Sequence, residues 1–596
     1  MNLLGTLLRD AAQLPAVSGE RVFVTGSNQE ADEYYTSVES TGCVIVGEDH
    51  DWGDRWYASR PARTGDPMHD LAAPLLRVPI VGQSATQRAE ALAAGIARTK
   101  PEQVRHVCMP GDEAAPWDAN VSRRVCRDAG VPLIVVTPGQ PAAEPSIAQP
   151  KVQVASASSG RKERAAPATG ERSRKSLKSV GAFGEYQRTW FSDLRQRVAN
   201  GEPLAVVNAN APQEILRALD IPFVVNQWWA SIVAAKQQSR RYLDLLREHG
   251  YPTQFDSYSS QGLAALLDDD AAQAPWGGLP RPSFLHALNG TDGVARLFEA
   301  WANESGADLF LFERTVDARW QLFSDWWESL PQRWDEVLER ERVDLMEIEL
   351  RELIAHLERR TGRTFPHERF AHVMDLVNQQ EEYYRRTRDL IARTTPAPAG
   401  IVDTMPATMT PQWHRGTEWA RDAARAFYEE VAQRVERGEA ACANERVRLM
   451  WVGRGMWSEM GFYQRWEASH GAVFVWSMYL ALAADGYIRT FDRGRDPLRA
   501  LAARVVTMGD ELRMPTWAAA WHVNEAKTHG VDGAVALSDA DPFVLRALER
   551  AGIPVLALPL DNFNKEGADR AAIDRSVTEF IEGPVSVLAA KRAGQK

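Results

Sequence analysis

Residues 203–262 read PLAVVNANAPQEILRALDIPFVVNQWWASIVAAKQQSRRYLDLLREHGYPTQFDSYSSQG. The stretch opens with a short apolar run, Leu204 to Val207, and polar residues interrupt it before a helical pattern begins at Pro212. A second apolar run of strand length covers Ile221 to Val225. We therefore expect a buried strand, a turn, a helix and a second strand, which together start a parallel α/β sheet.

Polar and aromatic residues follow both predicted strands. Asn208 and Asn210 come after the first strand, and Asn226, Trp228 and Trp229 come after the second. In open α/β sheets, ligands bind beyond the carboxyl ends of the strands. We therefore predict that these five residues line one pocket, with core packing as the alternative role of the tryptophans.

The same stretch carries a family resemblance. The segments Asn208-Ala-Asn-Ala-Pro-Gln-Glu214 and Gly250-Tyr-Pro-Thr-Gln-Phe-Asp256-Ser-Tyr resemble the opening domain of the 2-hydroxyacyl-CoA dehydratase and benzoyl-CoA reductase family. In that family, cysteines at two positions of these segments hold a [4Fe-4S] cluster at the reacting thioester. Here the two positions hold Asn208 and Asp256, and neither side chain replaces a soft thiolate.

The cysteines elsewhere in the chain do not fill this gap. The chain has four, Cys43, Cys108, Cys126 and Cys442, and none belongs to a CxxC pair that would indicate a zinc or redox site. Unpaired cysteines most often act as small buried hydrophobic residues. We therefore expect no cofactor on this chain, and the resemblance implies that a [4Fe-4S] cluster would belong to a partner subunit.

Composition narrows the class of protein. A length of 596 residues predicts three to four domains, and 44% hydrophobic with 25% charged residues is typical of soluble globular proteins. The net charge of −11 argues against nucleic-acid binding. No apolar run is long enough to span a membrane, and the amino-terminal MNLLGTLLRDAAQL reads as an amphipathic helix without a cleavage site. Together with the unpaired cysteines, these features predict a cytoplasmic protein.

Strands and helices alternate in the first part of the chain. Predicted strands start at Arg21, Gly42, Val104 and Val131, with helices at 30–40 and 118–128. The loop after the second strand contains His50 with Asp49, Asp51 and Asp54. We interpret it as a polar loop at a strand end, because neighbouring residues of one loop cannot all point at one metal ion.

Residues 141–182 read as a disordered basic linker. Residues 138–182 include no aromatic residue, and residues 151–180 contain eight Lys or Arg against two Glu. Such a segment cannot bury enough apolar surface to offset its chain entropy.

The last part of the chain repeats the first. Gly42-Cys-Val-Ile-Val corresponds to Gly471-Ala-Val-Phe-Val, and the next matching strands follow 62 and 60 residues later, at Val104 and Val531. The final matching strand runs from Val531 to Leu537 and ends at Ser538, where the family carries its third cluster cysteine.

The resemblance then implies a domain plan of several doubly wound, Rossmann- or flavodoxin-like parallel sheets with a helical connection. Residues 183–316 would form the first α/β domain of a family subunit, 317–440 the helical region and 441–596 the closing α/β domain. Residues 1–140 would be a spare copy of the closing half.

The closing domain adds candidates for binding acyl-CoA. Two glycines in Gly453-Arg-Gly-Met-Trp457 allow close approach of a ligand, and Arg454 is placed to meet a CoA phosphate. Trp457 and the segment Trp476-Ser-Met-Tyr479 would form walls of the acyl site, and Ser257 and Ser538 complete the predicted substrate-binding set. A tight turn and core packing are the alternatives for this loop and its tryptophans.

Three functions remain open. The first is a cluster-free subunit of a dehydratase-like or aromatic acyl-CoA reductase-like complex, bound to a sister subunit and a CoA thioester. The second is a redox-neutral acyl-CoA lyase or hydratase, with Asp256 as acid or base and the asparagines as donors to the thioester oxygen. The third is a structural subunit without a ligand.

Overall fold

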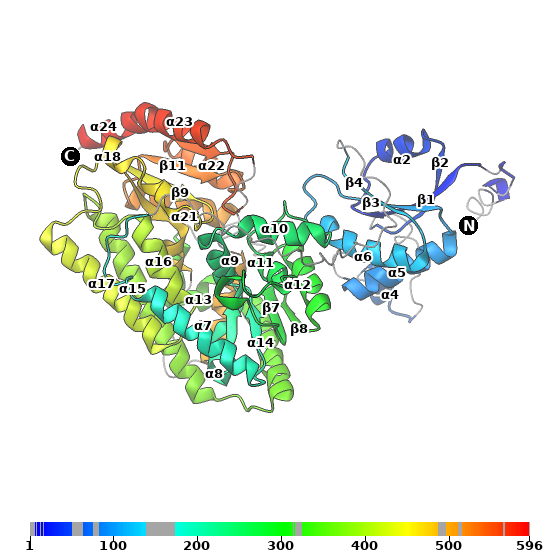
Figure 1. The fold of residues 1–596 in the computed structure, drawn as a ribbon, viewed down its shortest axis with the longest axis horizontal. Helices are drawn as coiled ribbons and strands as arrows, with labels where there is room; N and C mark the ends of the chain where they lie inside the picture. Colours follow the sequence, from blue (N-terminus) through cyan, green and yellow to red (C-terminus); the bar gives the residue numbers. More distant parts are fainter. Residues whose placement is uncertain are drawn as a thin grey trace, which may run out of the picture. The chain divides into compact units, whose positions relative to one another are not determined.

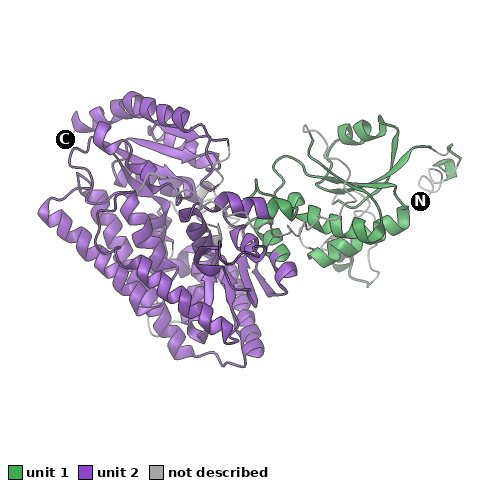
Figure 2. Ribbon diagram, viewed as in Figure 1, with its two compact units in different colours: residues 1–161, 246–255, 291–300 green, residues 162–245, 256–290, 301–596 purple. Residues whose placement is uncertain are grey.

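The computed structural model describes most of the chain in two compact units. The described residues are 6, 9–11, 13–15, 17–50, 64–75, 83–138, 173–313, 315, 325–486, 496–510, 515–563 and 567–594. Figure 2 colours the two units, which are residues 1–161 with 246–255 and 291–300, and residues 162–245, 256–290 and 301–596. Within the described ranges, every helix is too short or too polar to cross a lipid bilayer.

The first unit contains a four-stranded parallel sheet (Figure 1). Its strand order is β2-β1-β3-β4, and Val22, Phe23 and Val24 of the inner strand β1 are fully buried. The elements are β1 (Glu20–Gly26), α2 (Asp32–Glu39), β2 (Cys43–Glu48), α4 (Pro67–Leu75), α5 (Ala85–Thr99), β3 (Gln103–Val107), α6 (Ala115–Ala129) and β4 (Leu133–Val136).

The second unit begins with a sheet of the same kind. Its strand order is β6-β5-β7-β8, and all pairs are parallel. The strands are β5 (Ala205–Val207), β6 (Phe223–Val225), β7 (Phe284–Leu288) and β8 (Asp308–Phe312). The helices of this stretch are α7 (Phe183–Ala199), α8 (Gln213–Leu219), α9 (Asn226–Ala235), α10 (Ser239–Glu248), α11 (Gln261–Leu266), the 3-10 turn η1 (Pro275–Gly277) and α12 (Asp292–Ser305).

A helical region follows, as expected from the long helical pattern. It comprises α13 (Trp326–Val337), α14 (Arg340–Thr361), α15 (His367–Arg393), α16 (Ile401–Gln412) and α17 (Glu418–Arg437). The helices α15 and α17 pack along each other (Figure 1). Tyr384 and Ile391 of α15 and Phe427 and Val431 of α17 belong to one buried cluster.

The closing sheet has the strand order β10-β9-β11-β12. Its elements are β9 (Val447–Val452), η2 (Met460–Gln464), α18 (Glu467–His470), β10 (Ala472–Ser477), α19 (Met478–Asp485), α20 (Pro497–Asp510), α21 (Pro515–Thr528), β11 (Gly533–Leu537), α22 (Pro542–Arg550) and β12 (Val555–Leu558). The chain ends with α23 (Arg570–Phe580), η3 (Ile581–Val585) and α24 (Ser586–Gly594).

All three sheets share one topology, which confirms the predicted α/β class. In each sheet the first strand in sequence lies between the second and the third, and the fourth lies at the far edge. The first and closing sheets also share a register shift between their first two strands, at Val22/Phe23 and at Phe474/Trp476. This shared irregularity is what the internal repeat in the sequence predicts.

The predicted linker, residues 141–182, is partly packed in the structure. Most of the predicted linker, residues 139–172, lies outside the described residues, but residues 173–182 pack on the second unit. The Ser176 backbone N–H donates to Asp403 Oδ1 at 2.8 Å, and Leu177 and Val180 are buried. Residues 173–182 of the predicted linker are therefore part of the packed structure.

The aspartate-rich loop after β2 is described only in part, because Asp51 and Asp54 lie outside the described residues. His50 is buried, and its Nε2 lies 3.0 Å from both Glu48 Oε2 and the Tyr35 hydroxyl. In the part of the chain that the structure describes, no group of three or more His, Cys, Asp or Glu side chains is arranged to hold a metal ion.

Candidate functional site

The carboxyl ends of two sheets in the second unit bring the central candidates together. Asn208 follows β5, whereas Arg454 follows β9 and Ser538 follows β11. Asp256 lies in the turn before α11. The segments that carry Asn208, Asp256 and Arg454 are far apart in the sequence, and the contacts described next join them.

Asn208 and Gln227 tie the ends of β5 and β6 to each other. Gln227 Nε2 donates to Asn208 Oδ1, and the Ala209 backbone N–H donates to Gln227 Oε1 at 2.8 Å. The Gln227 carbonyl accepts a hydrogen bond from the Tyr258 hydroxyl at 2.8 Å. Asn208 is therefore linked through Gln227 to the turn that carries Asp256.

Asp256 forms an ion pair with Arg454 of the closing domain. Arg454 Nη1 lies 2.9 Å from Asp256 Oδ1, and the two side chains are 39% and 18% exposed. Asp256 raises the pKa of Arg454 above its ordinary value.

The backbone of Asp256 is unusual as well. Its φ of 46° lies in the left-handed region, which aspartate and asparagine tolerate better than most residues. Asp256 Oδ1 also accepts a hydrogen bond from the Ser259 backbone N–H at 3.2 Å, which stabilises the turn. Asp256 thus shapes the turn and also presents its carboxylate to Arg454.

Two further carboxylates surround Arg454. Asp539 and Asp561 both act on its charge after Asp256, and Ser257 Oγ donates to Asp561 Oδ1 at 3.3 Å. Asp539 is exposed, yet the atoms that crowd its carboxyl raise its pKa, against the opposing effect of Arg454. The charges of three carboxyl groups therefore act on one guanidinium, and the ion pair is with Asp256.

Aromatic side chains border this cluster. Tyr258 is buried and its ring lies 5.9 Å from that of Phe563. Burial raises the pKa of Tyr258 well above its ordinary value, so its hydroxyl stays protonated and can donate. The rings of Trp457 and Tyr479 are 5.7 Å apart, and the Tyr479 hydroxyl accepts from the Gly455 backbone N–H at 2.6 Å.

The two loop glycines are explained by packing. Gly453 has a φ of 116°, and a Cβ there would lie 3.1 Å from the Leu537 side chain. A Cβ on Gly455 would meet Met405 Cε at 2.1 Å. The loop therefore closes against β11 and α16, and this holds Arg454 beside Asp256.

The remaining candidates occupy different environments. Asn210 is half-buried, and the exposed Ser538 donates through Oγ to the Leu560 carbonyl at 3.2 Å. Four others are at most 2% exposed and make internal hydrogen bonds or ring contacts: Asn226 with the Ser259 carbonyl, Trp228 with Gln187, Trp229 with Phe191, and Trp476 with Glu525. Their burial favours the packing role for these tryptophans.

Gln227 and Tyr479 lie in the segments 226–229 and 476–479, each of which follows a predicted strand and was a candidate for the pocket wall. Three other residues of this site were not among the sequence candidates: Tyr258, Asp539 and Asp561. Tyr258 lies two positions from Asp256, and Asp539 follows Ser538 directly, so only their position next to candidates pointed to them. No local pattern identified Asp561.

Comparison with known proteins assigns the family. A family model described as "2-hydroxyglutaryl-CoA dehydratase, D-component" matches residues 2–153 and 208–583. The chain belongs to this family. The match confirms the resemblance seen in the sequence, and it includes most of the repeated amino-terminal module.

Two curated relatives are similar at low identity. The (R)-2-hydroxyisocaproyl-CoA dehydratase alpha subunit of Clostridioides difficile is 22% identical over 281 residues, which are 47% of this chain and 64% of the relative. The (R)-phenyllactyl-CoA dehydratase alpha subunit of Clostridium sporogenes is 20% identical over 258 residues, 43% of this chain and 59% of the relative. The matches thus span less than two thirds of either relative.

Proposed function

We propose that this chain is a subunit of a 2-hydroxyacyl-CoA dehydratase-like or aromatic acyl-CoA reductase-like complex, and that it shapes the acyl-CoA cleft without ligating an iron–sulfur cluster. The observation that carries the proposal is the 2.9 Å contact between Asp256 and Arg454. It joins the loop after β9 to the turn before α11, and Tyr258 ties that turn to Gln227 just past the carboxyl end of β6, in a chain of the dehydratase family. Ligands of such sheets bind at these ends.

The side chains at this site do not fit an iron–sulfur cluster. Such clusters are held by cysteine thiolates, whereas Asn208, Asp256 and Ser538 offer amide and oxygen groups. Cys442 is the cysteine of the second unit, and it precedes β9 at the opposite, amino end of the strand. We therefore assign any cluster of the complex to a partner subunit. Both relatives are named as alpha subunits, which supports a sister chain.

The protein groups at the site have defined capacities. Arg454 can orient a carbonyl or another polar acyl group, and the neutral Tyr258 hydroxyl can donate a hydrogen bond. Asp256 faces a guanidinium and so suits the role of a base or of an electrostatic partner better than that of an acid. Asp539, with its raised pKa, suits the acid.

A redox-neutral acyl-CoA lyase or hydratase is the second candidate. The left-handed backbone of Asp256 favours it, because strained conformations concentrate at functional sites. In that reaction Asp256 and Asp539 would exchange protons with the acyl group, and no reductant would be needed.

Purification from the native source tests the main proposal. We expect the chain to elute with a cysteine-rich sister subunit, and acyl-CoA dehydration to require both. Iron and sulfide analysis of the isolated chain should be negative. A stoichiometric cluster on the isolated chain would contradict the proposal, and turnover by the chain alone without ATP or reductant would establish the second candidate instead.

The contribution of the ion pair is tested by Asp256→Asn. Asparagine keeps the left-handed turn but removes the charge facing Arg454, so we expect acyl-CoA turnover by the complex to fall about tenfold, or about 1.4 kcal/mol of transition-state stabilisation. The matched control is Asp422→Asn, which removes the partner of Arg425 on the exposed face of α17. Equal turnover of the two variants would exclude Asp256 from the reaction.

A further inference from the structure

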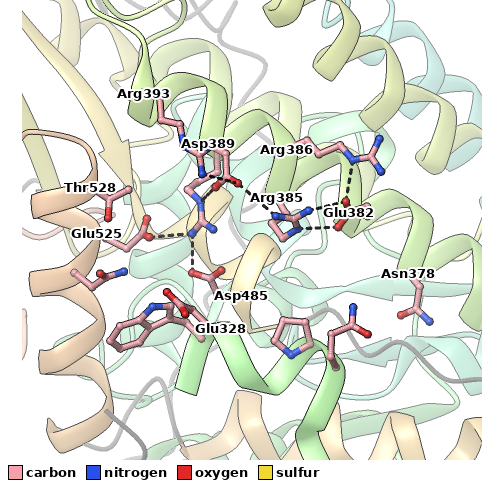
Figure 3. A pocket seen from close by; sticks show the side chains of 15 residues that line it. Glu328, Asn378, Glu382, Arg385, Arg386, Asp389, Arg393, Asp485, Glu525 and Thr528 are labelled. Atoms are coloured by element: carbon pink, nitrogen blue, oxygen red, sulfur yellow. Dashed lines mark hydrogen bonds and ion pairs between the residues drawn. The ribbon is translucent and has the colours of Figure 1, made fainter. Parts of the chain in front are cut away.

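A pocket lies between the helical region and the helices α19 and α21 of the closing domain, and none of the candidate site residues line it. It has a volume of about 610 Å³ and is bounded by α13, α15, α19 and α21 (Figure 3). Pockets of 300–1,000 Å³ are typical of small-molecule sites. Its lining is unusually rich in arginine, because four come from α15 alone: Arg385, Arg386, Arg388 and Arg393.

The floor of the pocket is a buried ion cluster. Arg388 Nη1 lies 2.8 Å from Asp485 Oδ2 and 2.9 Å from Glu525 Oε1, and the three side chains are 11%, 3% and 1% exposed. The indole N–H groups of Trp521 and Trp476 donate to the same two carboxylates at 2.8 and 2.7 Å. Arg388 and the two indoles therefore already occupy these carboxylates, and burial raises the pKa of Asp485 to about 6.

The lining holds five carboxylates beside its four arginines, but two of the arginines make few contacts with them. Glu382 receives two hydrogen bonds from Arg385 and one from Arg386, each at 2.8 Å. Arg386 uses only its Nε in this way, and neither of its Nη atoms has a partner in the described part of the chain. Arg393 reaches Asp389 only at 3.8 Å and is 78% exposed. These two guanidinium groups are available to an anion.

An aromatic side chain borders the same space. Trp327 of α13 is half-buried, and its indole N–H is shielded from water without a hydrogen-bond partner among the described residues. Asn524 and Thr528 of α21 add polar side chains to the lining.

We propose that this pocket binds a phosphorylated nucleotide, with its base beside Trp327 and its phosphates on Arg386 and Arg393. Arginine pairs with phosphate through parallel N–H bonds, and bases stack on aromatic rings. The volume exceeds what inorganic phosphate needs. The ligand is either the nucleotide end of acyl-CoA or a free nucleotide that regulates the protein. In the first case the inference rests on the proposed function.

Calorimetry on the full chain tests the site. We expect adenosine 3′,5′-bisphosphate to bind and inorganic phosphate to bind at least tenfold more weakly, because phosphate lacks the base. The double variant Arg386→Gln/Arg393→Gln should weaken binding of the bisphosphate at least tenfold. Arg425→Gln, which removes an exposed arginine of α17, should leave it unchanged. Equal affinity in the two variants, or no binding at millimolar concentration, would overturn the proposal.

Competition distinguishes the two sources. If the nucleotide is the end of CoA, free CoA displaces the bisphosphate and the double variant raises the KM for acyl-CoA with kcat unchanged. If it is a free effector, ADP displaces the bisphosphate and CoA does not. Nucleotide binding is measured without turnover, so failure of the dehydratase proposal would leave this result intact.

Discussion

Replacement of Glu214 by alanine is expected to lower the free energy of unfolding by about 3–5 kcal/mol. Glu214 Oε1 lies 2.7 Å from Arg415 Nε and 3.2 Å from Arg504 Nη1, and all three side chains are at most 5% exposed. Burial alone raises the pKa of Glu214, but the two arginines outweigh it and hold the value at about 2. Loss of the carboxylate leaves two buried guanidinium groups short of counter-charge.

Chemical denaturation followed by tryptophan fluorescence measures this change. Glu429→Ala is the matched control, because Glu429 is 59% exposed and lies 3.9 Å from Arg425 on α17. The control should change stability by less than about 0.5 kcal/mol. A Glu214 variant as stable as the control would show that the buried cluster contributes nothing.

Replacement of Glu381 by glutamine should remove a pH dependence of stability. Burial raises the pKa of Glu381 to about 7, against the lowering effect of Arg504, which lies 2.8 Å away. The folded state therefore holds this proton more tightly than the unfolded state, whose pKa is near 4.5. The protonated Glu381 therefore contributes its full stabilisation of the folded state below pH 4.5, and this stabilisation is lost as the pH rises to about 7.

Glutamine imitates the protonated carboxyl and does not titrate. The free energy of unfolding of the variant, minus that of the natural chain, should therefore increase by roughly 2–3 kcal/mol from pH 5 to pH 8. The depressed pKa of Glu214 acts in the opposite direction but only below pH 4.5, so the two effects occupy separate ranges. Denaturation curves of both proteins at pH 5 and pH 8 check this prediction. The same difference in the free energy of unfolding at the two pH values would contradict it.

Local pattern was enough to predict the three sheets. Short apolar runs that end at glycine, asparagine or serine gave the strands β1, β5, β6 and β11 within a few residues of their bounds. The spacing of the repeat also indicated that the first and closing domains share one topology. These features depend on neighbouring residues, which a single sequence records fully.

The direction of side chains after a strand was harder to predict. Trp228 and Trp229 follow β6, a position where ligands often bind, but α9 begins at once at Asn226. That helix turns both indoles toward α7, where they lie against Phe191 and are fully buried. Whether a residue faces a cavity or the core depends on this rotation, and the rotation is set by packing.

Long-range charge pairing was not visible in the sequence either. Arg454 was expected to meet a CoA phosphate, and 198 positions separate it from Asp256, its partner in the fold. The Glu214 cluster likewise joins α8 to α20 across nearly 300 positions. Such pairs arise only when separate domains assemble.

The positive φ of Asp256 limits which substitutions evolution can accept at this position. Glycine, asparagine and aspartate adopt that geometry easily, whereas β-branched residues are strongly disfavoured. Among related chains that keep this turn, a restricted residue set at the position would therefore reflect main-chain geometry as much as chemistry. Selection for the carboxylate itself would be recognised by covariation with Arg454, in which loss of one charge accompanies loss of the other.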